Sequence, residues 1–161
     1  MKTLYVLRHG QAAPETETVS DHERELTKHG RAEVRRTAQH LSERASLPGL
    51  VLSSTAVRAR QTAELCVGAW PRGIELITVD DLYLAGPSSY LAALVSRGQD
   101  HARAMVVGHN PGLEALIDVL TQRSEHLPTA ALVEIELPIE SWFELSKARR
   151  GFGQFLAAFR G

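Results

Sequence analysis

LYVLRHG, residues 4–10, is the stretch that decides the fold this sequence predicts. Its first four residues are apolar or aromatic with no polar alternation, which is typical of a strand buried on both faces of a parallel sheet. The run then ends in an arginine, a histidine and a glycine. Ligands bind at the carboxyl edge of open α/β sheets, so this triplet predicts a site there. The alternative is a strand that has merely ended in a polar loop.

Length and composition narrow the classes of protein. The 161 residues suit a single domain, residues 1–161, that can bury a proper core. Hydrophobic residues make up 43% and charged residues 23%, which disfavours disordered, collagen-like and coiled-coil chains. The formal net charge of −1 provides no basic field, so we expect neither nucleic acid nor a membrane surface as a partner. Any anion site must therefore be local.

Cysteine use and hydropathy indicate where the protein works. Cys66 is the only cysteine, so the chain has no internal disulfide and no thiolate zinc cluster, and we expect a small buried side chain there. We find no signal-peptide pattern and no stretch near the roughly 18 apolar residues of a spanning helix. These features predict a cytoplasmic protein.

Strand and helix patterns alternate along the chain, which predicts an α/β sheet covered by helices. The expected strands are Thr3–Leu7, Leu50–Ser53, Glu75–Val79, Ala104–Gly108 and Ala130–Leu137. The expected helices are Lys28–Arg44, Ala56–Trp70, Ser88–Arg97 and Leu113–Gln122, with Thr27 as the N-cap of the first.

The C-terminal segment, residues 141–161, has the weakest pattern. We expect a strand at Trp142–Leu145 followed by a short terminal helix. Gly151 and Gly153 lower the helix propensity of that last part.

Two further strands end in residues that suit the same site. Arg58 lies about one turn inside the helix after the second strand, so its side chain can point back to the strand edge. A solvated helical arginine is the alternative, and we expect Arg60 to be one. The fourth strand ends in Gly108, His109 and Asn110, which places a second histidine at a carboxyl strand end.

Arg8, His9, Arg58 and His109 together suit a phosphoryl group. Two guanidinium forks match phosphate oxygens, and a helix N-terminus adds to the attraction for an anion. Nearby positive charge disfavours the imidazolium form, so a histidine there can act as a nucleophile near neutral pH. We assign that role to His9, because Arg8 is beside it. We expect no metal, since arginines would repel a cation and no His-x-His or His-Glu-x-x-His spacing occurs.

The sequence resembles the histidine phosphatase superfamily, also called phosphoglycerate mutase-like. The resemblance is carried in order by LRHGQ (7–11), LTKHG (26–30), SSTAVRARQTA (53–63) and VVGHNP (106–111). It implies a three-layer αβα sandwich with a mostly parallel central sheet. It also implies a phosphohistidine intermediate on His9, with Arg8, Arg58 and His109 completing the phosphate pocket, and no metal or organic cofactor.

The short chain without a long insertion looks most similar to the SixA-type phosphohistidine phosphatases. Other branches of the superfamily place a glutamate in the loop after the third strand as proton donor. The comparable stretch here is VDDLYLAGPSS, where that position falls near Tyr83 or Leu84. Asp80 and Asp81 are close by, and the sequence leaves open whether either donates a proton or is simply a solvated loop carboxylate.

A missing acid restricts the substrate, because an alkoxide leaving group gains about 10²–10⁴-fold from a proton donor. The P–N bond of phosphohistidine is labile and needs less help. We therefore expect a phosphatase that acts on phosphohistidine displayed by a partner protein. The alternatives are a phosphatase of small phosphoesters and a non-catalytic module that binds phosphate or a phosphoprotein.

Other polar residues near the motifs have less defined roles. Gln11 and Asn110 follow the two histidines directly, so they can bind phosphate or hold the imidazole rings, or be ordinary loop residues. Asp21 and Arg24 can orient the loop after His9 or form a local salt bridge. The remaining histidines are expected at the surface or at caps, namely His22, His29, His40, His101 and His126.

Overall fold

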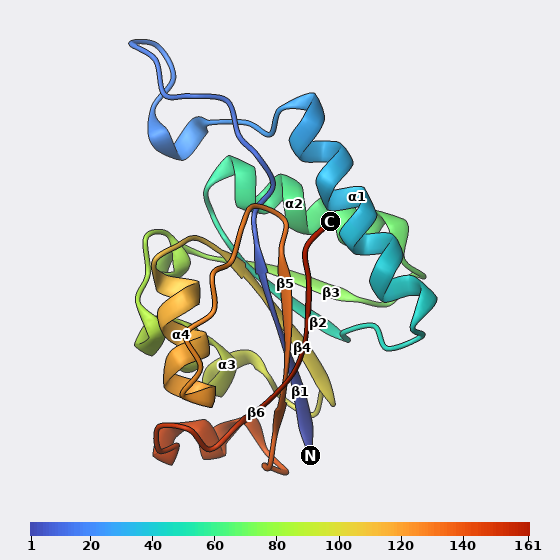
Figure 1. Ribbon diagram of the computed structural model, residues 1–161, viewed down its shortest axis with the longest axis vertical. Coiled ribbons are helices and arrows are strands. Elements are labelled where there is room, and N and C mark those ends of the chain that lie inside the picture. The colour runs from blue at the N-terminus through green and yellow to red at the C-terminus, as the bar shows by residue number, and fades with distance from the viewer.

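A computed structural model describes residues 1–161 and has three layers (Figure 1). The strands are β1 Lys2–Arg8, β2 Leu50–Ser54, β3 Glu75–Val79, β4 Arg103–Gly108, β5 Leu132–Leu137 and β6 Gln154–Phe159. The helices are α1 Lys28–Glu43, α2 Val57–Ala69, α3 Pro87–Arg97 and α4 Gly112–Thr121. Three 3₁₀ helices complete the chain, η1 Asp21–Glu23, η2 Asp80–Leu82 and η3 Trp142–Lys147. No helix is long and apolar enough to cross a membrane.

The six strands form one sheet in the order β3-β2-β4-β1-β5-β6. The pairs β3–β2, β2–β4 and β4–β1 are parallel, whereas β5 runs antiparallel to β1 and β6 antiparallel to β5. The expected αβα architecture with a mostly parallel sheet is confirmed.

The two faces of the sheet are covered by different helices. In β1, Leu4 and Val6 belong to one core cluster with residues of α3, α4 and η3, whereas Tyr5 and Leu7 belong to another with residues of α1 and α2. All four side chains are fully buried. A strand covered on both faces has no solvent side, which explains the continuous apolar run in the sequence.

The expected C-terminal elements are wrong. Residues 142–147 form η3, because Ser141 and Glu144 make a capping box: the hydroxyl of Ser141 accepts from the Phe143 amide, and Glu144 accepts from the Ser141 amide. This turn buries Trp142 and Leu145, which lie three residues apart. After Gly151, whose φ of +78° suits a glycine, the chain pairs with β5 as strand β6 instead of forming a helix.

Gly10 and Gly30, the glycines of the RHG and KHG motifs, join α1 to the end of β1. A Cβ on Gly10 would lie 2.7 Å from the Gly30 carbonyl oxygen, and one on Gly30 would lie 2.0 Å from the Gln11 carbonyl oxygen. The expected N-cap is confirmed, since the Thr27 hydroxyl accepts from the Gly30 amide at 2.9 Å. Because neither glycine has a Cβ, α1 can pack directly against the segment that carries His9.

The Gly30→Ala variant should be less stable than the wild type by about 1–3 kcal/mol, because the new methyl group meets backbone that can move only if α1 or the loop shifts. Gly68→Ala in α2 is the matched control, since a Cβ there meets nothing within 4 Å and should add up to about 1 kcal/mol of stability. Urea unfolding of both variants measures this. Equal stabilities would contradict the close approach.

Candidate functional site

The parallel pairing of β1 with β4 brings His9 and His109 together. Its register ends with Arg8 opposite Gly108, so the next residue of each strand leaves the sheet at the same edge. The two imidazole rings lie with their centroids 5.1 Å apart. Both are deeply buried, with 7% of His9 and 3% of His109 exposed.

His9 is held as a neutral imidazole with a lone pair on one nitrogen. Its Nδ1 lies 2.7 Å from the Gly10 carbonyl oxygen, which can only accept, so Nδ1 carries the proton and Nε2 has the lone pair. Burial lowers the pKa of His9 to about 4, and the guanidiniums of Arg58 and Arg8 act in the same direction. Near neutral pH, Nε2 is therefore a nucleophilic nitrogen.

His109 is oriented by Ser54. Its Nε2 lies 2.8 Å from the Ser54 hydroxyl, which also accepts from the Ala56 amide. The simplest assignment has that hydroxyl donate to Nε2, so that the proton of His109 is on Nδ1. Burial lowers the pKa of His109 to about 3, with His9 and Arg58 as the next causes. Nδ1 is buried and has no hydrogen-bond partner in the protein.

The two arginines leave donors available at the same edge. Arg58, 4% exposed, donates from Nε to His9 Nε2 at 3.3 Å and from its other nitrogens to Asp21. Arg8 donates from Nη1 to the Leu127 carbonyl oxygen at 3.2 Å, while its Nε is buried without a partner. Buried donors without partners are uncommon, and an oxyanion among these residues would satisfy them.

Asp21, for which the sequence left open a role near His9 or a local salt bridge, forms that salt bridge with Arg24 and also contacts two site residues, Arg58 and Tyr83. Its carboxylate accepts from Arg24 at 3.0 Å, from Arg58 at 3.1 Å and from the Tyr83 hydroxyl at 2.5 Å. The hydrogen bond from Tyr83, with those from the two arginines, holds the pKa of Asp21 well below its usual range. The Tyr83 ring also packs edge-on against His109 at 5.7 Å. Asp21 is thus an ionised anchor that orients Arg58.

Of the two polar candidates, only Asn110 points inward. Asn110 donates from Nδ2 to Glu114 and to the Leu127 carbonyl oxygen, and its Oδ1 is buried without a partner. Gln11 is exposed, and its side chain accepts from the Thr27 hydroxyl at the start of α1. Neither its side chain nor its backbone amide, which donates to Glu33, makes a hydrogen bond to the two histidines.

Asp80, Asp81 and His22 are residues to which the sequence assigns no definite role in the site. Asp80 and Asp81 are exposed and make no hydrogen bond to the site. His22 is half-buried, packs edge-on against Tyr83 at 4.8 Å and bonds to the Thr55 hydroxyl, so it is nearer the site than expected. No group of three or more His, Cys, Asp or Glu side chains lies close enough together to hold a metal ion.

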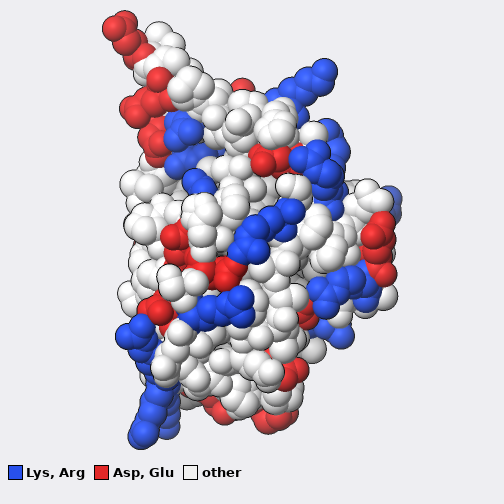
Figure 2. Space-filling model, in the orientation of Figure 1, with Lys and Arg blue, Asp and Glu red and all other residues white.

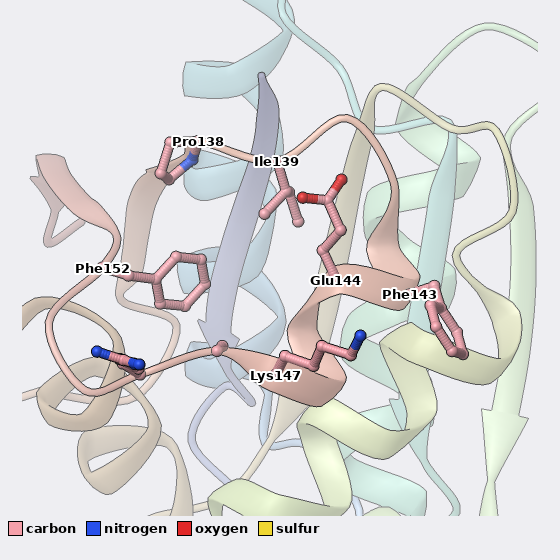
Figure 3. A pocket seen from close by; sticks show the side chains of 8 residues that line it. Pro138, Ile139, Phe143, Glu144, Lys147 and Phe152 are labelled. Atoms are coloured by element: carbon pink, nitrogen blue, oxygen red, sulfur yellow. The ribbon is translucent and has the colours of Figure 1, made fainter.

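The surroundings of the site are mixed in charge. Figure 2 shows acidic side chains at the tip of the projecting β1–α1 loop, where Glu15 and Glu17 are exposed, and interspersed acidic and basic side chains over the rest of this face. A separate hollow of about 410 Å³ lies at the opposite end of the molecule beside η3, where Ile139 and Phe152 face the space (Figure 3). Its lining includes Glu144 and Lys147 but no histidine.

Comparisons with known proteins found a matching family model and similar structures. A model of the histidine phosphatase superfamily, branch 1, matches residues 4–83. An uncharacterised protein of Picosynechococcus is 30% identical over 128 residues, which are 77% of each chain. A crystal structure from Agrobacterium tumefaciens, provisionally assigned as phosphohistidine phosphatase SixA, is 27% identical with a TM-score of 0.82 and covers 98% of this chain and 97% of its own. One from Nakamurella multipartitia with the same provisional assignment is 25% identical with a TM-score of 0.83, covering 98% and 95%.

Both site histidines should lower the stability of the protein as the pH falls. In the folded chain they take up a proton only near pH 4 and pH 3, whereas in the unfolded chain they do so near pH 6.5. Between these values the unfolded chain binds more protons, so the free energy of unfolding should decrease from pH 7 to pH 4. The measurement is urea unfolding across this range, together with NMR titration of the imidazole signals.

The double variant His9→Gln, His109→Gln is the control, and its stability should depend less steeply on pH. Imidazole signals of the folded wild type that titrate near pH 6.5 would contradict the effect assigned to burial.

Proposed function

The chain belongs to the histidine phosphatase superfamily, branch 1, and from this we propose that it is a phosphatase that transfers a phosphoryl group first to His9 and then to water. The observation that carries the proposal is the neutral, buried His9, whose Nδ1 proton is held by the Gly10 carbonyl oxygen and whose Nε2 lies beside Arg58. A nucleophile needs that lone pair, and a phosphoryl group needs the adjacent positive charge.

In the first step, Nε2 of His9 attacks phosphorus, and the bond from phosphorus to the leaving group breaks with its electron pair going to that group. Arg8, Arg58 and the Nδ1 proton of His109 stabilise the charge on the phosphoryl oxygens. In the second step, water displaces the phosphoryl group from His9 and gives inorganic phosphate. Asp21 acts through Arg58, because its ion pair fixes the direction of the guanidinium.

The substrate that we propose is phosphohistidine on a partner protein. Three carboxylates lie around the site, and each accepts hydrogen bonds. Asp21 accepts from Arg58, Arg24 and Tyr83. Glu33 accepts from Thr129 and the Gln11 amide, and Glu114 accepts from Asn110 and the Leu127 amide. Tyr83 is a poor acid, because its hydrogen bond to Asp21 raises the pKa of the phenol. A substrate whose leaving group needs little protonation suits such a site. The resemblance to two structures provisionally assigned as SixA supports the same class.

A substrate panel tests this class. Protein phosphohistidine and p-nitrophenyl phosphate, which both carry good leaving groups, should be turned over at least about 100-fold faster than sugar phosphates of comparable affinity. Released phosphate is measured for each. Fast turnover of sugar phosphates with protein phosphohistidine untouched would instead support a small-molecule phosphatase, and stoichiometric binding without phosphate release would support a binding module.

The variants His9→Ala and His109→Ala should separate the two histidines. His9→Ala should abolish the acid-labile phosphoenzyme together with turnover, because it removes the attacking nitrogen. His109→Ala should slow turnover by about 10²–10³-fold, the scale of losing one donor to the transition state, and some phosphoenzyme should still form. Rapid-quench labelling measures the phosphoenzyme.

Label that survives in His9→Ala but disappears in His109→Ala would reverse the assignment of the two histidines. Label absent from the wild type and from both variants would point to direct attack by water.

A further inference from the structure

A small recess lies beside His109, between the β3–α3 and β4–α4 loops. It is lined by residues 84–87, 109–112 and 115 and has a volume of about 290 Å³. The two loops touch directly at one side of it, where a Cβ on Gly112 would lie 1.9 Å from the Ala85 carbonyl oxygen. We propose that this recess is the leaving-group subsite and that it holds one imidazole ring, the ring of the phosphorylated histidine; the proposal rests on the proposed function.

The size and lining of the recess fit a single flat ring. Its volume is slightly below the range of about 300–1,000 Å³ for pockets that take whole drug-sized ligands, so it suits one side chain. The walls are apolar, from Leu84, Pro87, Pro111 and Ala115, and the polar residues in the lining are His109 and Asn110. Leu84 is 67% exposed and has a φ of +52°, so a strained turn presents an apolar side chain at the rim.

Asn110 supplies the specific contact. The direction of its amide is fixed, because Nδ2 donates to two acceptors, Glu114 Oε1 at 2.9 Å and the Leu127 carbonyl oxygen at 2.8 Å. This leaves Oδ1 as a buried acceptor without a partner. A buried acceptor that no group of the protein satisfies indicates a donor on the ligand.

A phosphorylated imidazole offers such a donor. When the ring nitrogen that does not carry phosphorus is protonated, its N–H can donate to Asn110 Oδ1. Attack by His9 Nε2 then breaks the P–N bond, the electron pair stays on the ring nitrogen, and the ring leaves as neutral imidazole with its N–H proton in place. No further acid is consumed.

The arrangement is symmetrical about the transferred phosphorus. On the enzyme side, the Nδ1 proton of His9 is held by the Gly10 carbonyl oxygen at 2.7 Å. On the substrate side, the corresponding proton is held by the amide oxygen of Asn110. Each imidazole then has the proton of its non-reacting nitrogen held by a carbonyl oxygen, so transfer needs no proton to move at either ring.

The experiment compares two small substrates that differ in one proton. Phosphoimidazole can donate an N–H to Oδ1, whereas its N-methyl analogue, 1-methyl-3-phosphoimidazolium, cannot. The ratio of kcat/KM for the first over the second should fall by about 10- to 100-fold in Asn110→Ala relative to the wild type, the range for a hydrogen bond to a charged group. The intrinsic reactivity of each substrate cancels in this comparison.

Glu114→Ala is the matched control, because it removes the same hydrogen bond between α4 and the loop but keeps Oδ1 of Asn110. It should slow both substrates together and leave the ratio within about twofold of the wild type. An unchanged ratio in Asn110→Ala, with p-nitrophenyl phosphate still turned over by the wild type, would overturn the subsite and leave the proposed function standing. If the wild type turns over neither phosphoramidates nor phosphoesters, both proposals fail.

A second pair of variants tests the apolar rim. Leu84→Ala should raise KM for phosphoimidazole by about 3- to 10-fold while leaving inhibition by inorganic phosphate unchanged, since the lost contact is with the ring and not with the phosphoryl group. Leu156→Ala removes another exposed leucine, on β6, and should change neither constant. Equal changes in KM and in phosphate inhibition for Leu84→Ala would contradict a role specific to the leaving group.

Discussion

The parallel pairing of β1 with β4 is the constraint on which the rest of the site depends. It ends with Arg8 opposite Gly108, so both imidazoles emerge side by side at one edge. Because β1 and β4 are apolar on both faces, the alternation of polar and apolar side chains specifies this register only weakly. Packing at Gly108 adds specificity, since a Cβ there would lie 2.0 Å from the Tyr90 hydroxyl, which also accepts from the His109 amide. The core therefore fixes the spacing of the reacting groups.

Burial of the site has a cost in stability that local partners offset. Two neutral histidines and one guanidinium lie below the surface, and an unpaired charge there would be strongly destabilising. Arg58 is paired with Asp21, the two nitrogens of His9 are engaged by Gly10 and Arg58, and Nε2 of His109 is engaged by Ser54. Of the four buried polar atoms without a hydrogen-bond partner, Arg8 Nε, His109 Nδ1 and Asn110 Oδ1 lie at the site, and the fourth, Glu134 Oε2, lies on β5 beside Arg44. The concentration of unsatisfied atoms at the site is the pattern expected where function opposes stability.

The sequence predicts the parts of the structure whose signals are local. Buried strands read as apolar runs, and the residues at their ends, such as His9 and His109, could be assigned to one edge from topology alone. Asp21 and Tyr83 could not, because their hydrogen bond joins residues 62 positions apart and nothing in either local pattern indicates it. The C-terminal strand was missed for a related reason: β6 alternates only between exposed and half-buried positions, and its partner β5 decides its conformation.

The carboxylates around the site explain why its chemistry and its geometry cannot be changed independently. A carboxylate that anchors a guanidinium must stay ionised, and one that donates a proton must be neutral at the start of the reaction. Asp21 cannot do both, because losing its charge would release Arg58, the side chain that lies beside Nε2 of His9. An acid for alkoxide leaving groups would have to be an added residue, at a position such as Leu84 at the rim. With an apolar side chain there, the site suits the leaving group that we propose, one that brings its own proton.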